Sequence, residues 1–336
     1  MKIKDFVKDD YFKFDCETHL YNDISHLQHF KWLQQGSRGA AGAVKALGLA
    51  HPELAKLVPP LQGWPPASPP ELLIEFMDKY GVDMACVMRE DVTIASGYST
   101  PYSTNGQMLE ACEKYPDRFV FVANIAPMLR RGMEESLWEL EYLAKEKNCK
   151  VVKFIGELAP FNDRQFWPFY EKVRELGLVL FVHTGCAWVP PFPTKYYHPE
   201  ALDEVANHFP EISIVAFHGG WPYTRTLNMI AATHPNVYIQ LSLMLPWCIT
   251  APRRAAEIIG EAIQFVGSER VIFGTDYFGP GAELLIRLSV QGFSEFEIPE
   301  DMQEGYGFAP LTPDVKRKIF GENLSRLLDI EPDRKA

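Results

Sequence analysis

Short apolar runs alternate with segments of helical period along the whole chain. The runs are continuously apolar rather than alternating, which is typical of strands buried on both faces of a parallel sheet. Eight runs are expected to be strands: 11–16, 84–89, 119–125, 150–155, 179–183, 212–218, 237–242 and 271–274. Helical periodicity between them predicts helices that include 70–80, 103–115, 133–147, 164–176 and 252–265.

Eight strand-helix units predict a single α/β domain, a (β/α)8 barrel of the TIM type that occupies residues 1–336. An open doubly wound sheet is the structural alternative. No strand is followed by a GxGxxG or GxxxxGK[ST] turn, so the usual phosphate cradle of those open sheets is missing.

Two intervals interrupt this rhythm. Residues 21–70, with a proline-rich stretch from Pro59 to Pro70, form a long insertion after the first strand. In a barrel it would lie on the catalytic face, as a lid or an oligomer contact, or simply as a solvated loop. Residues 292–310 are expected to form an irregular loop after the eighth strand, on the same face.

Composition narrows the class of protein. The net charge of −11 argues against a nucleic-acid partner, because nothing supplies a broad positive field. The charged N-terminus and the lack of a long apolar run favour a cytoplasmic protein with no membrane contact. The six cysteines lack CxxC spacing and are read as reduced thiols. A small-molecule substrate is therefore the expected partner.

Polar residues able to bind metal or transfer protons stand where the predicted strands end. Glu17 and His19 end the first strand, two positions apart, and so face the same way. His183 ends the fifth strand, His218 the sixth, and Asp276 follows the eighth. The carboxyl ends of barrel strands converge at one mouth, so these side chains are expected to gather around one point.

On these residues the chain resembles the amidohydrolase superfamily, in the branch of aminocarboxymuconate-semialdehyde decarboxylase and γ-resorcylate decarboxylase. The resemblance extends from Asp15 to the closing ENLSRLL segment. It implies one divalent metal ion, Zn²⁺ or alternatively Mn²⁺, and commonly a homodimer. The implied metal ligands are Glu17, His19, His183 and Asp276, and the implied catalytic residues are His218 and Asp276.

The first metal motif favours one reaction. Most of the superfamily has HxH where this chain has Glu17-Thr18-His19, and a glutamate there resembles the decarboxylases of substituted aromatic acids. We therefore expect a metal-dependent decarboxylase of a small aromatic or unsaturated carboxylic acid. A metal-dependent hydrolase of an amide, lactone or related bond is the alternative, and an inactive ligand-binding barrel is a third reading. Lys153, at the position of a carbamylated lysine in binuclear members, is expected instead to pair with an acid such as Glu157.

Residues that would hold the substrate are less sharply indicated. An arginine matches a carboxylate with two hydrogen bonds, and aromatic rings suit a flat substrate. The candidates are Arg38, Arg89, Arg225, Trp188, Trp221 and Tyr277.

Overall fold

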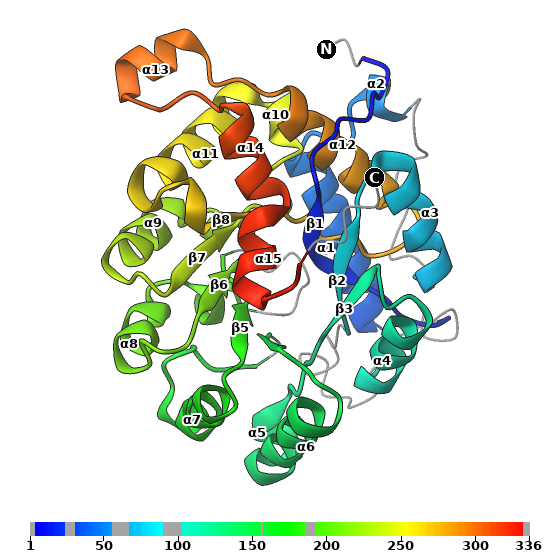
Figure 1. The fold of residues 1–336 in the computed structure, drawn as a ribbon, viewed down its shortest axis with the longest axis vertical. Helices are drawn as coiled ribbons and strands as arrows, with labels where there is room; N and C mark the ends of the chain where they lie inside the picture. Colours follow the sequence, from blue (N-terminus) through cyan, green and yellow to red (C-terminus); the bar gives the residue numbers. More distant parts are fainter. Residues whose placement is uncertain are drawn as a thin grey trace.

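The computed structural model describes residues 4–23, 31–55, 67–89, 103–155, 157–185 and 193–331. These residues contain eight parallel strands at the centre of the molecule, with helices around them (Figure 1). All eight lie within or beside the runs predicted from the sequence. The strands are β1 Phe14–His19, β2 Met84–Met88, β3 Phe119–Val122, β4 Val151–Phe154, β5 Val179–Val182, β6 Ile214–Ala216, β7 Val237–Gln240 and β8 Val271–Ile272.

The sheet closes on itself. Continuous pairing joins β1 to β3 and β4 to β8, and a parallel bridge between Ala123 and Val152 links β3 to β4. On the other side, Cys16 N donates to Phe273 O at 3.2 Å, and a second bridge joins Thr18 to Tyr277. These links connect the first strand to the last, so the predicted α/β barrel is confirmed.

The helices follow the predicted periodicity closely, and α3 spans the same residues as its prediction. Local sequence explains several helix starts. At α4, the Thr104 side chain accepts from Gln107 N, and the Gln107 side chain accepts from Thr104 N, which is a capping box. The main helices are α3 Pro70–Tyr80, α4 Asn105–Lys114, α5 Met128–Arg131, α6 Met133–Glu146, α7 Trp167–Glu175, α8 Ala201–His208, α9 Thr224–Thr233, α10 Trp247–Thr250, α11 Pro252–Val266, α12 Glu283–Glu295, α13 Glu300–Tyr306, α14 Pro313–Arg317 and α15 Asn323–Leu328.

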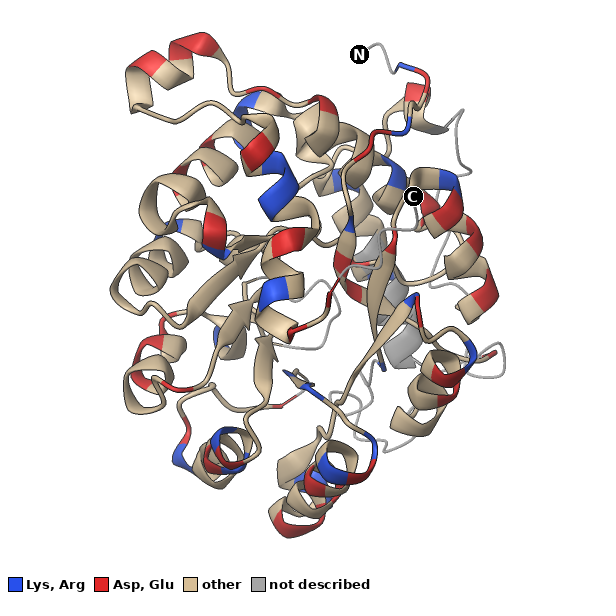
Figure 2. Ribbon diagram, viewed as in Figure 1, with Lys and Arg blue, Asp and Glu red and all other residues tan. Residues whose placement is uncertain are grey.

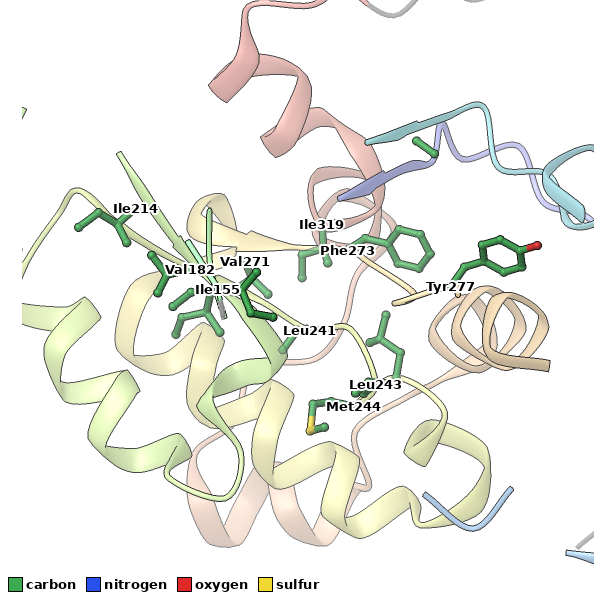
Figure 3. Close-up of a cluster of buried hydrophobic side chains, with 14 of the residues drawn as sticks. Ile155, Val182, Ile214, Leu241, Leu243, Met244, Val271, Phe273, Tyr277 and Ile319 are labelled. Atoms are coloured by element: carbon green, nitrogen blue, oxygen red, sulfur yellow. The ribbon is translucent and has the colours of Figure 1, made fainter. Parts of the chain in front are cut away.

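Each strand contributes to two apolar layers, which explains why the strands are apolar throughout. On β5, Phe181 belongs to the cluster inside the barrel and Val182 to the cluster beneath the helices. Figure 3 shows the outer layer, where Val182, Ile214 and Val271 lie together. The charged residues lie mainly on the surrounding helices, and the strands contain few of them (Figure 2). Polar residues inside the barrel are therefore unusual, and each indicates a structural or functional role.

The insertion after β1 is partly helical, which the sequence pattern did not predict. It contains α1 Lys31–Ala46 and α2 Pro52–Ala55. Tyr21 and Ser68 exchange backbone hydrogen bonds of 3.1 and 2.9 Å, so its two ends meet just beyond His19. Its role as a lid remains a prediction, as does the assignment of residues 1–336 to one domain.

The expectation of an irregular loop over 292–310 is wrong for most of those residues. The end of α12 and all of α13 lie within the interval. Two of its proline and glycine residues mark helix ends: Pro299 precedes α13, and Gly307 ends it in the left-handed conformation. Across the described residues, no helix has the length and apolar character needed to cross a bilayer.

Candidate metal centre

A bulge in β1 turns Glu17 and His19 into the barrel. Cys16 belongs to the inner apolar cluster, so regular alternation would point its neighbour Glu17 outward. The pairing of β1 with β2 shifts register between Asp15 and Thr18. This extra residue reverses the alternation, as bulges beside functional sites often do. Glu17 is then 1% exposed and His19 5% exposed.

Asp276 joins these two residues from the segment that follows the last strand, β8. Its backbone N–H donates to Glu17 O at 3.0 Å, and its φ of +59° is unusual for a residue other than glycine. His19 Nε2 lies 3.2 Å from Asp276 Oδ1 and 3.6 Å from Glu17 Oε1. One ligand atom from each of the three residues lies within 4.8 Å of the others. Two carboxylates and an imidazole at this spacing fit a divalent ion such as Zn²⁺ or Mn²⁺.

Asp15 fixes the two carboxylate-bearing segments relative to each other. Its side chain accepts hydrogen bonds from Glu17 N at 3.0 Å, Thr275 N at 2.9 Å and Thr275 Oγ1 at 2.5 Å. Burial raises the pKa of Asp15 to about 7, against these hydrogen bonds. Asp15 was not predicted as a functional residue, although its place two positions before Glu17 on the same strand was a usable signal.

Glu17 is surrounded by donors. Lys153 Nζ lies 2.6 Å from its Oε1, while Ser242 Oγ and Gln240 Nε2 lie 2.7 and 3.3 Å from its Oε2. Burial by itself would raise the pKa of Glu17, but the Lys153 ammonium, and after it His218 and His19, hold that pKa well below its usual range. Glu17 is therefore an ionised carboxylate inside the barrel.

The expected partner of Lys153 was an acid such as Glu157, and the acid it contacts here is Glu17. Glu157 lies just after β4 and accepts a hydrogen bond from the backbone N–H of Met128. Burial raises its pKa to about 7. Lys153 does pair with an acid, as predicted, but the acid is Glu17 and not Glu157, because Lys153 follows Val151 on the inward face of β4 and so points toward β1.

His183 and His218 form the other half of the site. His183 Nδ1 lies 3.1 Å from His218 Nε2, and His218 Nδ1 lies 2.8 Å from Ser242 Oγ. Because Phe217 already faces the barrel interior, the φ of +58° at His218 is what turns its ring inward. His183 is not one of the three residues grouped above. It is connected to Glu17 through His218 and Ser242.

Gln240 and Ser242 also belong to the site, and the sequence reasoning missed them. Both are fully buried where β7 ends, two positions apart, which is the same signal that identified Glu17 and His19. Gly274, just after the neighbouring strand β8, makes room for them. A β-carbon there would lie 2.1 Å from Gln240 Nε2.

The predicted arginine residues that the structure describes each have a different environment. Arg89 is 5% exposed and donates to Asn124 O at 2.7 Å and to Ala126 O. Arg38 is exposed on α1. The Arg225 side chain is 78% exposed and pairs with Glu261 at 2.9 Å. Trp188 lies outside the described residues.

Two of the predicted aromatic residues pack against other aromatic rings. Tyr277 is fully buried, and its ring meets that of Phe76 at 6.0 Å, within the core drawn in Figure 3. The Trp221 ring packs against Trp247 at 5.5 Å. Trp221 and Arg225 line an open groove of about 430 Å³ at the starts of α9 and α11.

Comparisons of the sequence give a family and one partial relative. A family model described as amidohydrolase matches residues 14–330. Among curated proteins, the fluG protein of Emericella nidulans is 34% identical over 135 residues, which are 40% of this chain and 15% of that protein. The match thus spans only a small part of that longer relative.

Solved structures share the fold over most of the chain. A TIM-barrel protein from Bordetella bronchiseptica has a TM-score of 0.63 at 20% identity and covers 94% of this chain and 98% of its own. A 5-carboxyvanillate decarboxylase from Novosphingobium aromaticivorans, solved with manganese, has a TM-score of 0.62 at 16% identity, covering 97% and 100%. A probable 2-pyrone-4,6-dicarboxylic acid hydrolase from Acinetobacter baumannii has a TM-score of 0.57 at 15% identity, covering 95% and 99%. At such identities the likeness is one of fold.

Proposed function

We propose a function on the premise that the chain belongs to the amidohydrolase family, whose model matches residues 14–330. The proposed activity is divalent-metal-dependent, non-oxidative decarboxylation of a small aromatic or unsaturated carboxylic acid. The observation that carries it is Glu17 in the first metal position, an ionised carboxylate that faces His19 and Asp276. The fold similarity to a 5-carboxyvanillate decarboxylase supports the same choice.

The proposed metal ligands are Glu17, His19, His183 and Asp276. Bound there, a divalent ion supplies positive charge that stabilises a substrate carboxylate and an adjacent oxygen. The ion would be zinc, with manganese as the alternative, since carboxylate and imidazole ligands suit both. Residues at the ends of the strands that orient the substrate reduce the entropy cost of the chemical step.

The proton transfer is assigned to Asp276 and His218. When the bond between the carbon and its carboxylate breaks, the electron pair stays on that carbon and carbon dioxide leaves. The carbon then takes one proton from Asp276, and His218 returns a proton to the site from water. One carboxylate and one proton therefore give one carbon–hydrogen bond and one molecule of carbon dioxide.

Hydrolysis of an amide, lactone or related bond is the second candidate. The fold similarity to a probable 2-pyrone-4,6-dicarboxylic acid hydrolase favours it. In that reaction Asp276 would accept a proton from the attacking water, and His218 would stabilise the developing oxyanion.

A substrate panel distinguishes the two reactions. Zinc-loaded and manganese-loaded protein is assayed with hydroxylated and amino benzoates for released carbon dioxide, and with amides and lactones for hydrolysis. We expect carbon dioxide from at least one benzoate. Cleavage of only the amides or lactones would refute the decarboxylase proposal.

Two variants test the residue roles. His218→Ala should abolish turnover and leave the metal content near that of the unchanged protein, while Glu17→Gln should lower the metal content. Loss of metal in His218→Ala would make His218 a ligand and contradict its assigned role.

A further inference from the structure

Ser242 stands at the centre of the polar network inside the barrel mouth. Its Oγ lies 2.7 Å from Glu17 Oε2, 2.8 Å from His218 Nδ1 and 2.8 Å from Gln240 Oε1. A hydroxyl carries one proton and two lone pairs, so Ser242 donates to only one of these three atoms. The atom that accepts the Ser242 proton determines which nitrogen of His218 carries a proton.

The neighbours of Gln240 remove one possibility. Its Oε1 accepts from His218 N at 3.1 Å and from Ser242 N at 3.0 Å. Two backbone donors identify this atom as the amide oxygen and use both of its lone pairs. The other end of the amide, Nε2, faces Glu17 Oε2 at 3.3 Å as a donor. The Ser242 proton is therefore not needed by Gln240.

Of the two atoms that remain, Glu17 Oε2 can only accept a hydrogen bond, whereas His218 Nδ1 can accept or donate one. The Glu17 carboxylate is buried against the Lys153 ammonium and has no proton to give. Ser242 thus donates to Glu17 Oε2 and has its lone pairs free toward His218. For the contact of 2.8 Å to be a hydrogen bond, His218 Nδ1 must carry the proton.

The same reasoning extends to His183. With its proton on Nδ1, a neutral His218 presents a lone pair at Nε2, and the atom 3.1 Å away is His183 Nδ1. His183 Nδ1 is then the donor, and its Nε2 keeps the lone pair that a metal ligand needs. In this series of hydrogen bonds, each donor and acceptor is consistent with His183 and Glu17 as metal ligands at the two ends.

We propose that Ser242 is a positioning residue that sets the direction of a hydrogen-bond chain from His183 through His218 and Ser242 to Glu17. The chain holds the His218 proton on Nδ1 and leaves Nε2 as the basic nitrogen. The use of that nitrogen in catalysis rests on the proposed function, whereas the position of the proton does not.

The first experiment observes the proton directly. Protein labelled with ¹⁵N-histidine, both zinc-loaded and metal-free, is studied by long-range ¹H–¹⁵N correlation, with His218 identified from the spectrum of His218→Asn. We expect the Nδ1–H form of His218 in the unchanged protein. A His218 protonated on Nε2, alone or together with Nδ1, would overturn the proposal.

The variants separate the hydroxyl of Ser242 from general packing. Ser242→Ala, or the similarly sized Ser242→Cys if the alanine variant fails to fold, should lose the preference for Nδ1–H, and Ser242→Thr should keep it. Thr184→Val is the matched control, because Thr184 Oγ1 is a buried hydroxyl beside His183 that donates to Phe217 O at 2.6 Å and contacts neither ring. It should also keep Nδ1–H. An unchanged His218 proton in the alanine or cysteine variant would contradict the role of Ser242.

A kinetic arm distinguishes this proposal from the proposed function. In Ser242→Ala, kcat should fall about 10- to 100-fold with KM within about twofold, because a misplaced proton affects the chemical step. A change in KM alone would argue against positioning. If the unchanged protein decarboxylates none of the panel, the proposed function fails, while the spectra still decide the role of Ser242.

Discussion

Two buried glutamates of this protein show how a charged partner, rather than burial, decides the charge of a buried acid. Glu17 is 1% exposed and Glu157 is 3% exposed; Glu17 lies in β1, and Glu157 follows the end of β4. Glu17 faces the Lys153 ammonium, and its pKa is lowered well below the usual range against the effect of burial. Glu157 accepts backbone N–H groups alone, and burial raises its pKa to about 7. A fixed ammonium outweighs desolvation, and backbone dipoles at this position do not.

As pH rises, ionisation of Glu17 therefore increases the free energy of unfolding, whereas ionisation of Glu157 decreases it. Because the pKa of Glu17 is lowered in the fold, its ionised form stabilises the fold above the unfolded pKa, and this contribution is lost as pH falls through the folded value. Because the pKa of Glu157 is raised, stability falls as pH rises from the unfolded value of 4.5 to about 7. The following changes test this difference, from the largest expected effect to the smallest.

Lys153→Met removes the partner and should have the largest effect. It leaves the Glu17 carboxylate buried with only neutral donors, which typically costs about 3–5 kcal/mol of unfolding free energy. The loss should be much smaller in metal-saturated protein, because a bound cation restores positive charge beside Glu17. Urea unfolding with and without chelator measures the loss of unfolding free energy in the metal-free and the metal-saturated protein. Lys79→Met is the control, since Lys79 is 56% exposed in its pair with Glu283, and equal losses with and without metal would contradict the expectation.

Glu157→Gln removes the acid that lacks a charged partner. The dependence of unfolding free energy on pH between about 5 and 8 should weaken by about 2–3 kcal/mol, because the variant no longer ionises a buried carboxyl. The two proteins are compared at each pH, so the contributions of Asp15 and other groups to the pH dependence cancel. A variant with the same pH dependence as the unchanged protein would show that Glu157 ionises without cost.

Metal removal tests whether a cation shares Glu17 with Lys153. Chelation should lower the unfolding free energy by about 2.7 kcal/mol relative to protein at a metal concentration 100 times the dissociation constant. Thermal unfolding across a zinc or manganese titration measures it. The effect should disappear in Glu17→Gln, and persistence there would place the metal elsewhere.

Arg225→Ala should have the smallest effect. Its ion pair with Glu261 is at the surface, so the loss of stability should stay below about 1 kcal/mol. Because the Arg225 side chain is 78% exposed and already paired with Glu261, kcat/KM on whichever benzoate proves active should change by less than about twofold. A large rise in KM would instead indicate that Arg225 binds the substrate carboxylate.

Sequence patterns predicted all eight strands, because burial on both faces leaves a clear apolar signal in each strand. The same logic placed Glu17, His19 and Asp276 near one another, since the carboxyl ends of barrel strands converge. Gln240 and Ser242 carried an equal signal, two polar residues at the end of an apolar strand, and were overlooked because neither residue type suggested metal or proton chemistry.

Other features depend on three-dimensional detail that spacing does not contain. The bulge near Cys16 and the left-handed backbone of His218 decide which side chains enter the barrel, and neither has a local sequence signature. The partner of Lys153 depends on which strand faces it across the interior. Arg225 follows a strand end closely in sequence, yet it belongs to α9 and its side chain is turned to solvent.

Gly274 has a consequence for how this protein tolerates change. It offers no functional group and touches no proposed substrate, but any β-carbon there would overlap the Gln240 amide at 2.1 Å. Displacing that amide would release the backbone of His218 and a donor to Glu17 together. A saturation scan of the chain should therefore find position 274 as intolerant as the metal ligands themselves, and a designer who transfers this site to another barrel must transfer that empty space with it.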